Sequence, residues 1–129
     1  MDLEDLEYIL DHYKSPRNYG KLTDPDITYE QGNPICGDKV RLDLELEDNI
    51  IKDIKFSGQG CTISQAAASM LTEEVINKDL EYIDTIDSEE MFKIIKAEVS
   101  PIRYECALLA LKVLKTAIKS YLQKTGKTN

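Results

Sequence analysis

The feature that most constrains the fold is a strictly alternating segment, residues 39–47, followed directly by a second strand-like segment, residues 50–57. Aliphatic side chains alternate with charged ones along the first segment, the pattern of a strand with one face on a core and the other in water. The aliphatic set is Val40, Leu42, Leu44 and Leu46, and the charged set is Arg41, Asp43, Glu45 and Glu47. Between the two segments, Asp48-Asn49 predicts a tight turn, so an antiparallel hairpin is expected.

The apolar spacing changes from the period of a strand to that of a helix after Cys61. The expected elements are helices at 3–13, 64–75 and 87–95, a long C-terminal helix from Pro101 to Lys124, and an edge strand at 27–30. Ser64 is expected to cap the second helix, and Asp87 with Glu90 resembles a capping box for the third. This order predicts an α+β fold, in which a small three-stranded antiparallel sheet carries helices mainly on one face, within a single domain spanning 1–129.

Composition narrows the setting in which this domain works. Its 129 residues are 42% hydrophobic, which is enough for one core without disulfide staples. The formal net charge of −8 argues against a nucleic-acid partner, which needs a basic surface, and favours a partner with a basic docking patch. The first residues are acidic and helix-like, and no apolar stretch is long enough to span a membrane. We therefore expect no secretory signal, no membrane partner and a cytoplasmic location.

Three cysteines stand in three different local contexts, each close to glycine, proline or a turn. They occur in the segments Gly32-Asn33-Pro34-Ile35-Cys36-Gly37-Asp38, Ser57-Gly58-Gln59-Gly60-Cys61-Thr62-Ile63-Ser64 and Ser100-Pro101-Ile102-Arg103-Tyr104-Glu105-Cys106. An odd number of thiols cannot all pair within one chain, and these contexts favour exposed turns over core packing. Converging thiolates select zinc or iron–sulfur. We therefore interpret Cys36, Cys61 and Cys106 as metal ligands.

The order of the elements allows these three thiols to meet at one edge of the sheet. Cys36 precedes one strand, Cys61 follows another, and Cys106 lies in the first turn of the last helix. The two glycines close before Cys61 permit positive φ and expose amide N–H groups that stabilise thiolate or sulfide charge. The positive end of a helix stabilises the thiolate form of Cys106, and Arg103 adds to this effect where its side chain turns toward the sulfur.

A tetrahedral site needs a fourth donor, and the sequence offers two carboxylates. Asp38 stands two residues after Cys36, and Glu105 directly precedes Cys106. Adjacent side chains on a helix diverge, which favours Asp38, although a turn-stabilising role is the alternative for this residue. An oxygen donor holds iron–sulfur less permanently than a fourth cysteine would, which suits a carrier. His12, the single histidine, is expected to cap or pack at the surface instead of binding metal.

Five motifs carry a resemblance that spans nearly the whole chain. They are Asp11-His12-Tyr13, Pro16-Arg17-Asn18, Cys36-Gly37-Asp38, Gly60-Cys61 with Ile63-Ser64, and Cys106 at the start of the last long helix. The chain resembles the U-type family of iron–sulfur cluster assembly scaffolds, which covers the Isc, Suf and Nif N-terminal branches. The resemblance implies the U-type fold and a scaffold or carrier that is not an enzyme. Such a protein accepts persulfide sulfur from a cysteine desulfurase, takes up ferrous iron, builds a [2Fe–2S] cluster on its three cysteines and passes it to apo-proteins or carrier proteins.

Features of both the Isc and the Suf branches occur in this chain. The segment around Cys61 is similar to the Suf branch, yet the 45 positions from Cys61 to Cys106 resemble the shorter Isc spacing. Glu105 stands where the Isc branch has histidine and the Suf branch usually lysine. In the family, the aspartate matching Asp38 is a ligand or release element. The fourth ligand is thus open between Asp38, Glu105 and a group from a partner, and residues 99–103 keep only part of a chaperone-recognition motif.

Two alternatives to a [2Fe–2S] scaffold remain open, as does the formation of a [4Fe–4S] cluster. One is a zinc-dependent sulfurtransferase, in which zinc orders the site and Cys106 accepts sulfur as a persulfide. The other is a structural zinc domain that uses the three cysteines and Asp38. Structural zinc sites usually close with Cys or His and often use paired cysteine spacings, and neither feature occurs here. The resemblance is compatible with a monomer or a homodimer.

Overall fold

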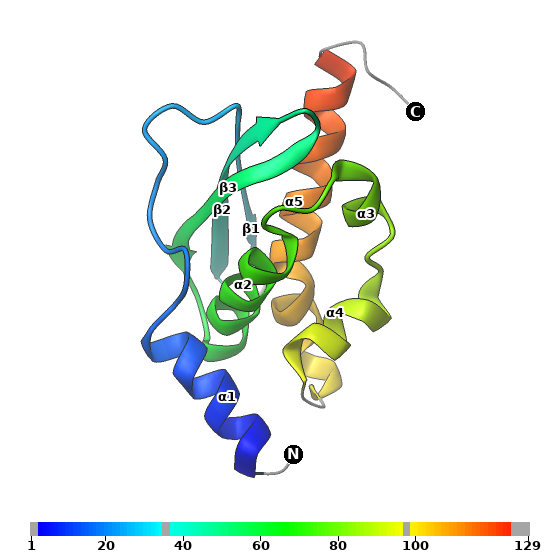
Figure 1. Cartoon of the computed structure of the whole chain (residues 1–129). Coiled ribbons are helices and arrows are strands. Elements are labelled where there is room, and N and C mark those ends of the chain that lie inside the picture. Colours follow the sequence, from blue (N-terminus) through cyan, green and yellow to red (C-terminus); the bar gives the residue numbers. More distant parts are fainter. Residues whose placement is uncertain (1–2, 35–36, 97–98, 125–129) are drawn as a thin grey trace.

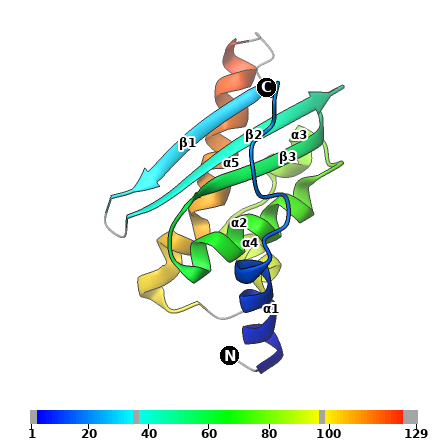
Figure 2. The same ribbon diagram turned by 90° about the vertical axis from the view of Figure 1, so that its left-hand side faces the viewer.

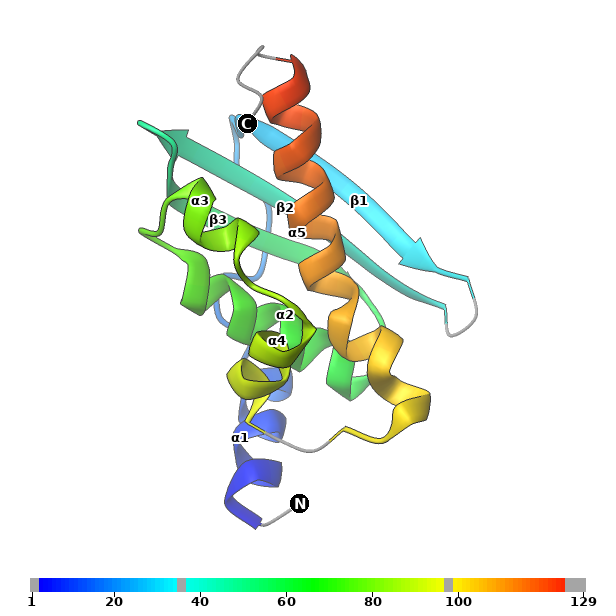
Figure 3. The ribbon, with the colours of Figure 1, turned by 90° about the vertical axis from the view of Figure 1, so that its right-hand side faces the viewer.

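A computed structural model of the chain describes residues 3–34, 37–96 and 99–124, and its architecture is α+β. The elements are α1 (Leu3–Lys14), β1 (Ile27–Asn33), β2 (Asp38–Glu47), β3 (Ile50–Gln59), α2 (Thr62–Val75), α3 (Leu80–Asp84), α4 (Ser88–Ile95), the 3₁₀ turn η1 (Pro101–Arg103) and α5 (Tyr104–Lys124). The sheet is antiparallel in the order β1-β2-β3. Figures 1 and 3 show α2, α4 and α5 on one face of it, so the predicted three-stranded sheet, the one-sided helices and the long C-terminal helix are confirmed. No helix in the described ranges is long and apolar enough to cross a membrane.

The central hairpin has the predicted turn and the predicted core face. Asp48 and Asn49 have φ of 53° and 64°, the left-handed values of a tight turn whose twist matches that of the two strands. The inward side chains of β2 and β3 form the centre of the core, which α2 and α5 cover. The fully buried members on these two strands are Val40, Leu42, Leu44, Ile51, Ile54 and Phe56.

The outer face of the sheet differs from the prediction, because Asp43 is buried instead of facing water. Its side chain is 1% exposed and accepts hydrogen bonds from Leu22 N at 3.0 Å, Thr28 Oγ1 at 3.1 Å and Arg41 Nε at 3.0 Å. The segment between α1 and β1 passes over this face, as Figure 2 shows. The carboxylate can be buried here because hydrogen bonds from these three donors replace those that water would give it.

His12 joins α1 to α2, and its predicted role as a cap or surface residue is wrong. The ring is 2% exposed, with Nδ1 2.7 Å from Ser69 Oγ and Nε2 3.4 Å from Glu73 Oε1. Arg17 N donates to the same Ser69 hydroxyl at 2.8 Å, so the end of α1 and the chain that follows are both held to the middle of α2.

This buried histidine predicts a loss of stability in mild acid. Burial lowers the pKa of His12 below its ordinary value, and the positive charge of Arg17 adds to the lowering, while nearby carboxylates oppose it. The unfolded chain therefore binds the proton more tightly, and the contribution of neutral His12 is present above about pH 6.5 and is lost as the pH falls toward the folded-state pKa. Urea unfolding across this range should show a steeper loss for the wild type than for His12→Gln. Equal pH dependence in the two proteins would contradict this prediction.

The remaining helices match the sequence in part. Asp87 Oδ1 accepts from Glu90 N at 2.9 Å, which confirms that Asp87 caps α4. The five-residue helix α3 was not predicted, because so short a segment contains too few apolar positions to show a period. Asp79 caps it by accepting from Tyr82 N at 2.8 Å.

Candidate metal centre

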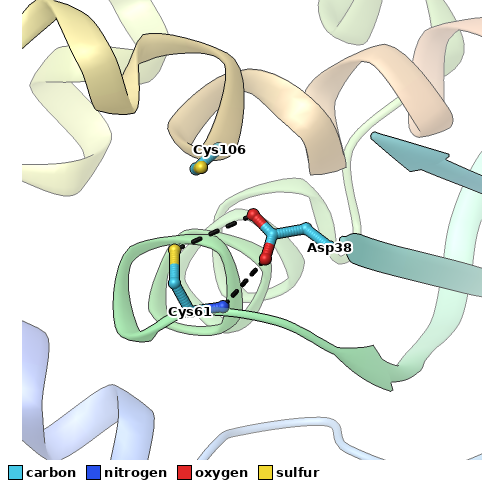
Figure 4. A group of neighbouring side chains, drawn as sticks. All are labelled: Asp38, Cys61 and Cys106. Carbon is cyan, nitrogen blue, oxygen red and sulfur yellow. Dashed lines mark hydrogen bonds between the residues drawn. The ribbon is translucent and has the colours of Figure 1, made fainter. Parts of the chain in front are cut away.

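Three potential donors from three separate elements converge at one end of the sheet. Asp38 is the first residue of β2, Cys61 is the N-cap of α2 and stands two residues after the end of β3, and Cys106 lies in the first turn of α5. One ligand atom from each lies within 4.8 Å of the others (Figure 4). Cys36 falls outside the described residues. The structure thus brings together two of the predicted thiols and the predicted carboxylate.

Asp38 is buried and already tied to the residue that begins α2. Its side chain is 3% exposed, and Oδ1 accepts from Cys61 N at 2.9 Å, while Oδ2 lies 3.8 Å from Cys61 Sγ (Figure 4). Cys61 makes no side-chain capping hydrogen bond of its own. The carboxylate of Asp38 therefore caps the helix from a distant strand, and its negative charge lies at the positive end of α2. One oxygen anchors the group, and the second faces the thiols.

The two glycines before Cys61 make this approach possible in two different ways. Gly58 has φ of +143°, and a Cβ there would lie 2.0 Å from Lys39 O in the neighbouring strand. Gly60 needs no positive φ, but a Cβ there would lie 2.5 Å from Asp38 Oδ1. Only glycine lets the chain come so close to the carboxylate.

Ser64 has a role that the sequence did not reveal. It was expected to cap α2, but that helix begins two residues earlier at Thr62. Its hydroxyl is buried and donates to Cys61 O at 3.1 Å, so it fixes the backbone of the thiol residue. The sequence alone does not distinguish a serine that caps a helix from one that, like Ser64, donates to the carbonyl of Cys61.

Two charged neighbours of Cys106 are exposed to solvent. Glu105 is 60% exposed and forms an ion pair with Lys112, about two turns further along α5, so the structure does not bring it into the donor group. Arg103 is exposed in η1. Cys106 itself is 2% exposed, whereas Cys61 is half-buried. The donor group is therefore open on the side of Cys61.

The donor chemistry fits zinc or ferrous iron. Tetrahedral zinc with bonds of about 2.3 Å to sulfur and about 2.0 Å to oxygen separates its ligand atoms by roughly 3.5–3.8 Å. The three donors lie within 4.8 Å of one another, so side-chain adjustments of about 1 Å bring them onto one ion. Soft sulfur with one hard oxygen accommodates either metal.

Comparison with known proteins identifies the family of this chain. The model of the NifU-like N-terminal domain matches residues 4–128. The chain belongs to this family. The resemblance to U-type scaffolds that the sequence indicated is thereby confirmed.

Curated relatives of this NifU-like chain include proteins from both branches. The zinc-dependent sulfurtransferase SufU of Bacillus subtilis is 37% identical over an alignment 129 positions long, which covers 87% of this chain and 87% of that protein. The iron–sulfur cluster assembly scaffold protein IscU of Aquifex aeolicus is 36% identical, with 98% of this chain and 82% of that protein covered. Among solved structures, a candidate SUF-system scaffold from Fervidobacterium islandicum has a TM-score of 0.75 at 30% identity, covering 88% of this chain and 95% of that one. The U-type fold is thus confirmed.

Proposed function

We propose that this chain is a non-enzymatic scaffold that assembles a [2Fe–2S] cluster and hands it to other proteins. The observation that carries the proposal is the convergence of Asp38, Cys61 and Cys106, with ligand atoms within 4.8 Å of one another. The family relationship to IscU proteins supports it. Cysteine ligands stay reduced in reducing compartments, so the proposed setting is the cytoplasm.

Cys36 is the fourth donor in this proposal. It precedes Asp38 by two residues, and two residues of extended chain reach at most about 7 Å, which keeps its sulfur within range of the donor group. Three sulfurs and one carboxylate oxygen then hold the two irons. The oxygen is the weakest of these ligands to iron, so it is the bond that opens first when the cluster leaves for an apo-protein or a carrier.

The proposed assembly fixes which reactants partners must supply. A cysteine desulfurase provides two sulfane sulfurs, each of which gains two electrons to become sulfide. The oxidation of two ferrous ions to ferric supplies two of the four electrons, and a thiol or one-electron reductant supplies the others. The iron and the cluster are cargo. The residues of this chain supply thiolate and carboxylate ligands, a helix N-terminus at Cys61, and a pocket in which Cys106 is shielded from water.

A second candidate function is zinc-dependent sulfur transfer, which the relationship to SufU and the fit of the three donors to a single ion favour. Here a thiolate attacks the terminal sulfur of the desulfurase persulfide. A new S–S bond forms on this chain, the S–S bond of the donor breaks, and the desulfurase cysteine leaves as a thiolate. Cys106 is the proposed acceptor, and because it is 2% exposed the transfer requires the turn η1 to move.

Anaerobic reconstitution separates the two functions. The protein is purified, analysed for metal and incubated with ferrous iron, cysteine, a reductant and a desulfurase, and the product is read by absorption and Mössbauer spectroscopy. We expect a [2Fe–2S] chromophore that transfers to an apo-ferredoxin and that Cys61→Ser cannot form. Tightly held zinc without a chromophore, together with a persulfide on one cysteine by mass spectrometry, would establish the sulfurtransferase instead. Zinc with neither activity would indicate a structural site.

A further inference from the structure

A groove lies at the end of the molecule remote from the cysteines. It is bounded by the hairpin turn at Asn49, by α3 and by the C-terminal half of α5, and its volume is about 850 Å³. Figure 3 shows α3 beside this part of α5. From Cys106 to Lys119 the helix rises about 20 Å at 1.5 Å per residue, so the groove and the donor group are separate surfaces.

The two walls of the groove carry opposite charges. Glu81 and Asp84 stand on the α3 side, whereas Lys115 and Lys119 stand on the α5 side. The apolar residues that line the groove between them are Leu80, Ile83, Ile118 and Leu122. Within residues 3–34, 37–96 and 99–124, no ion pair joins the two walls, and the ammonium of Lys115 reaches only the backbone oxygen of Asp84, at 3.5 Å. The groove therefore holds two rows of opposite charge apart.

We propose that this groove binds a second copy of the chain in a two-fold symmetric dimer. In such a dimer the same patch serves both copies, so it must be complementary to itself. A two-fold axis along the groove sets the acidic wall of each copy against the basic wall of the other. An axis across the groove would place each wall against the same wall of the other copy, so that like charges would face each other. The charge arrangement thus selects one orientation, with the α5 helices parallel.

The shape of the groove allows this pairing. When the axis is displaced toward α5 by a quarter of the width of the groove, the C-terminal end of α5 from each copy lies over the space between α3 and α5 of the other. Lys119 then reaches Glu81 of the second copy, while its aliphatic stem covers the apolar lining. Both donor groups remain open, because each lies at the far end of its own α5. The dimer leaves the cluster site of each copy accessible to its partners.

The net charge of −8 opposes self-association, and this makes the proposal testable against the simplest alternative. Long-range repulsion is screened beyond about 8 Å at physiological ionic strength, whereas charges in contact across the walls are screened less. If net charge determined the dimer affinity, Glu81→Lys would strengthen association, because it makes the protein less acidic. If charge pairing across the groove determines it, Glu81→Lys weakens association, because the introduced ammonium group faces Lys119 of the second copy.

Sedimentation velocity over a range of concentrations measures the dimer dissociation constant of the wild type, Glu81→Lys, Lys119→Glu and an equimolar mixture of the two variants. We expect each variant alone to dimerise at least about tenfold more weakly, since two attractive contacts become repulsive. In the mixed dimer both contacts are again between opposite charges, so the mixture should recover the wild-type constant to within about threefold.

Lys21→Glu is the matched control, because it makes the same charge change at an exposed position away from the groove. It should alter the dissociation constant far less than Lys119→Glu does. A wild type that stays monomeric up to about 1 mM, or a mixture no tighter than its components, would overturn the proposal. Circular dichroism of each variant excludes unfolding as the cause, and Lys115→Glu repeats the test at a second wall residue. Cluster assembly does not enter these measurements.

Discussion

Replacing Asp38 with alanine should weaken both metal binding and the fold, whereas replacing it with asparagine should weaken metal binding as much and the fold far less. The side chain has two functions that the two variants separate. Oδ1 accepts the Cys61 amide at the start of α2, and Oδ2 faces the thiol of Cys61. Asparagine retains a carbonyl oxygen for the amide but loses the anionic ligand. Alanine loses both and leaves the Cys61 N–H at the start of α2 without this acceptor.

The expected losses of stability and of zinc affinity in the two variants follow from these two functions. Loss of the helix cap costs about 1–2 kcal/mol of unfolding free energy, so Asp38→Ala should be destabilised by that amount and Asp38→Asn by well under half of it. Zinc affinity should fall by at least about 100-fold in both, since a ligand is lost and even outer hydrogen-bonding partners of a metal site are worth 10–100-fold. Competition with a chelating dye measures the affinity, and urea unfolding of the metal-free protein measures the stability.

Asp43→Asn is the matched control for this pair. Asp43 is the other buried aspartate of β2, and its partners are Leu22, Thr28 and Arg41 on the opposite face of the sheet. Its replacement should lower stability and leave zinc affinity unchanged. Equal stability of Asp38→Ala and Asp38→Asn would show that the capping contact contributes nothing. Unchanged zinc affinity in both would remove Asp38 from the donor group.

The sequence predicted the elements whose signals are local. The hairpin at Asp48-Asn49 follows from turn chemistry, and the core face of β2 follows from strict alternation. The convergence of Cys61 and Cys106 was also predictable, because the topology of a hairpin followed by helices leaves few places where a strand end and a helix start can meet.

Residues whose roles depend on distant partners were not predictable in the same way. His12 is buried because its two ring nitrogens contact Ser69 and Glu73, which lie more than fifty residues away in the sequence. Asp43 is buried because the segment before β1 returns over the sheet and brings Leu22 N to it. Alternation and helical period report which face a side chain occupies, but they do not report what covers that face.

Gly60 shows the same limit inside the donor group. Glycine near a cysteine was interpreted as freedom to adopt positive φ, and this is correct for Gly58. At Gly60 the reason is space, since an added Cβ would lie 2.4 Å from Ser64 Oγ and 2.5 Å from Asp38 Oδ1. The distinction matters because crowding makes the effect of a substitution at Gly60 depend on the side chains of Ser64 and Asp38.

Gly60→Ala should therefore damage the donor group directly, because the added methyl group would meet the Asp38 carboxylate itself. The Ser64 hydroxyl cannot turn away without breaking its hydrogen bond to Cys61 O, and Asp38 cannot move without breaking its hydrogen bond to Cys61 N. Crowding of a packed site costs about 1–3 kcal/mol, and we expect a loss of stability in this range. Zinc affinity should fall as well, because the displaced carboxylate no longer faces the thiols. Gln59→Ala, at the exposed neighbouring position, should change neither quantity.

A double-mutant cycle tests whether Asp38 is the cause of this loss. In the Asp38→Ala background the carboxylate that meets the new methyl group is absent, so Gly60→Ala should cost at least about 1 kcal/mol less than it does in the wild type. Ser64→Ala should relieve part of the stability loss, since it removes the other close atom, but should not restore zinc binding while Asp38 remains displaced. Strictly additive costs for positions 38 and 60 would mean that the glycine is required for a reason other than room for the carboxylate.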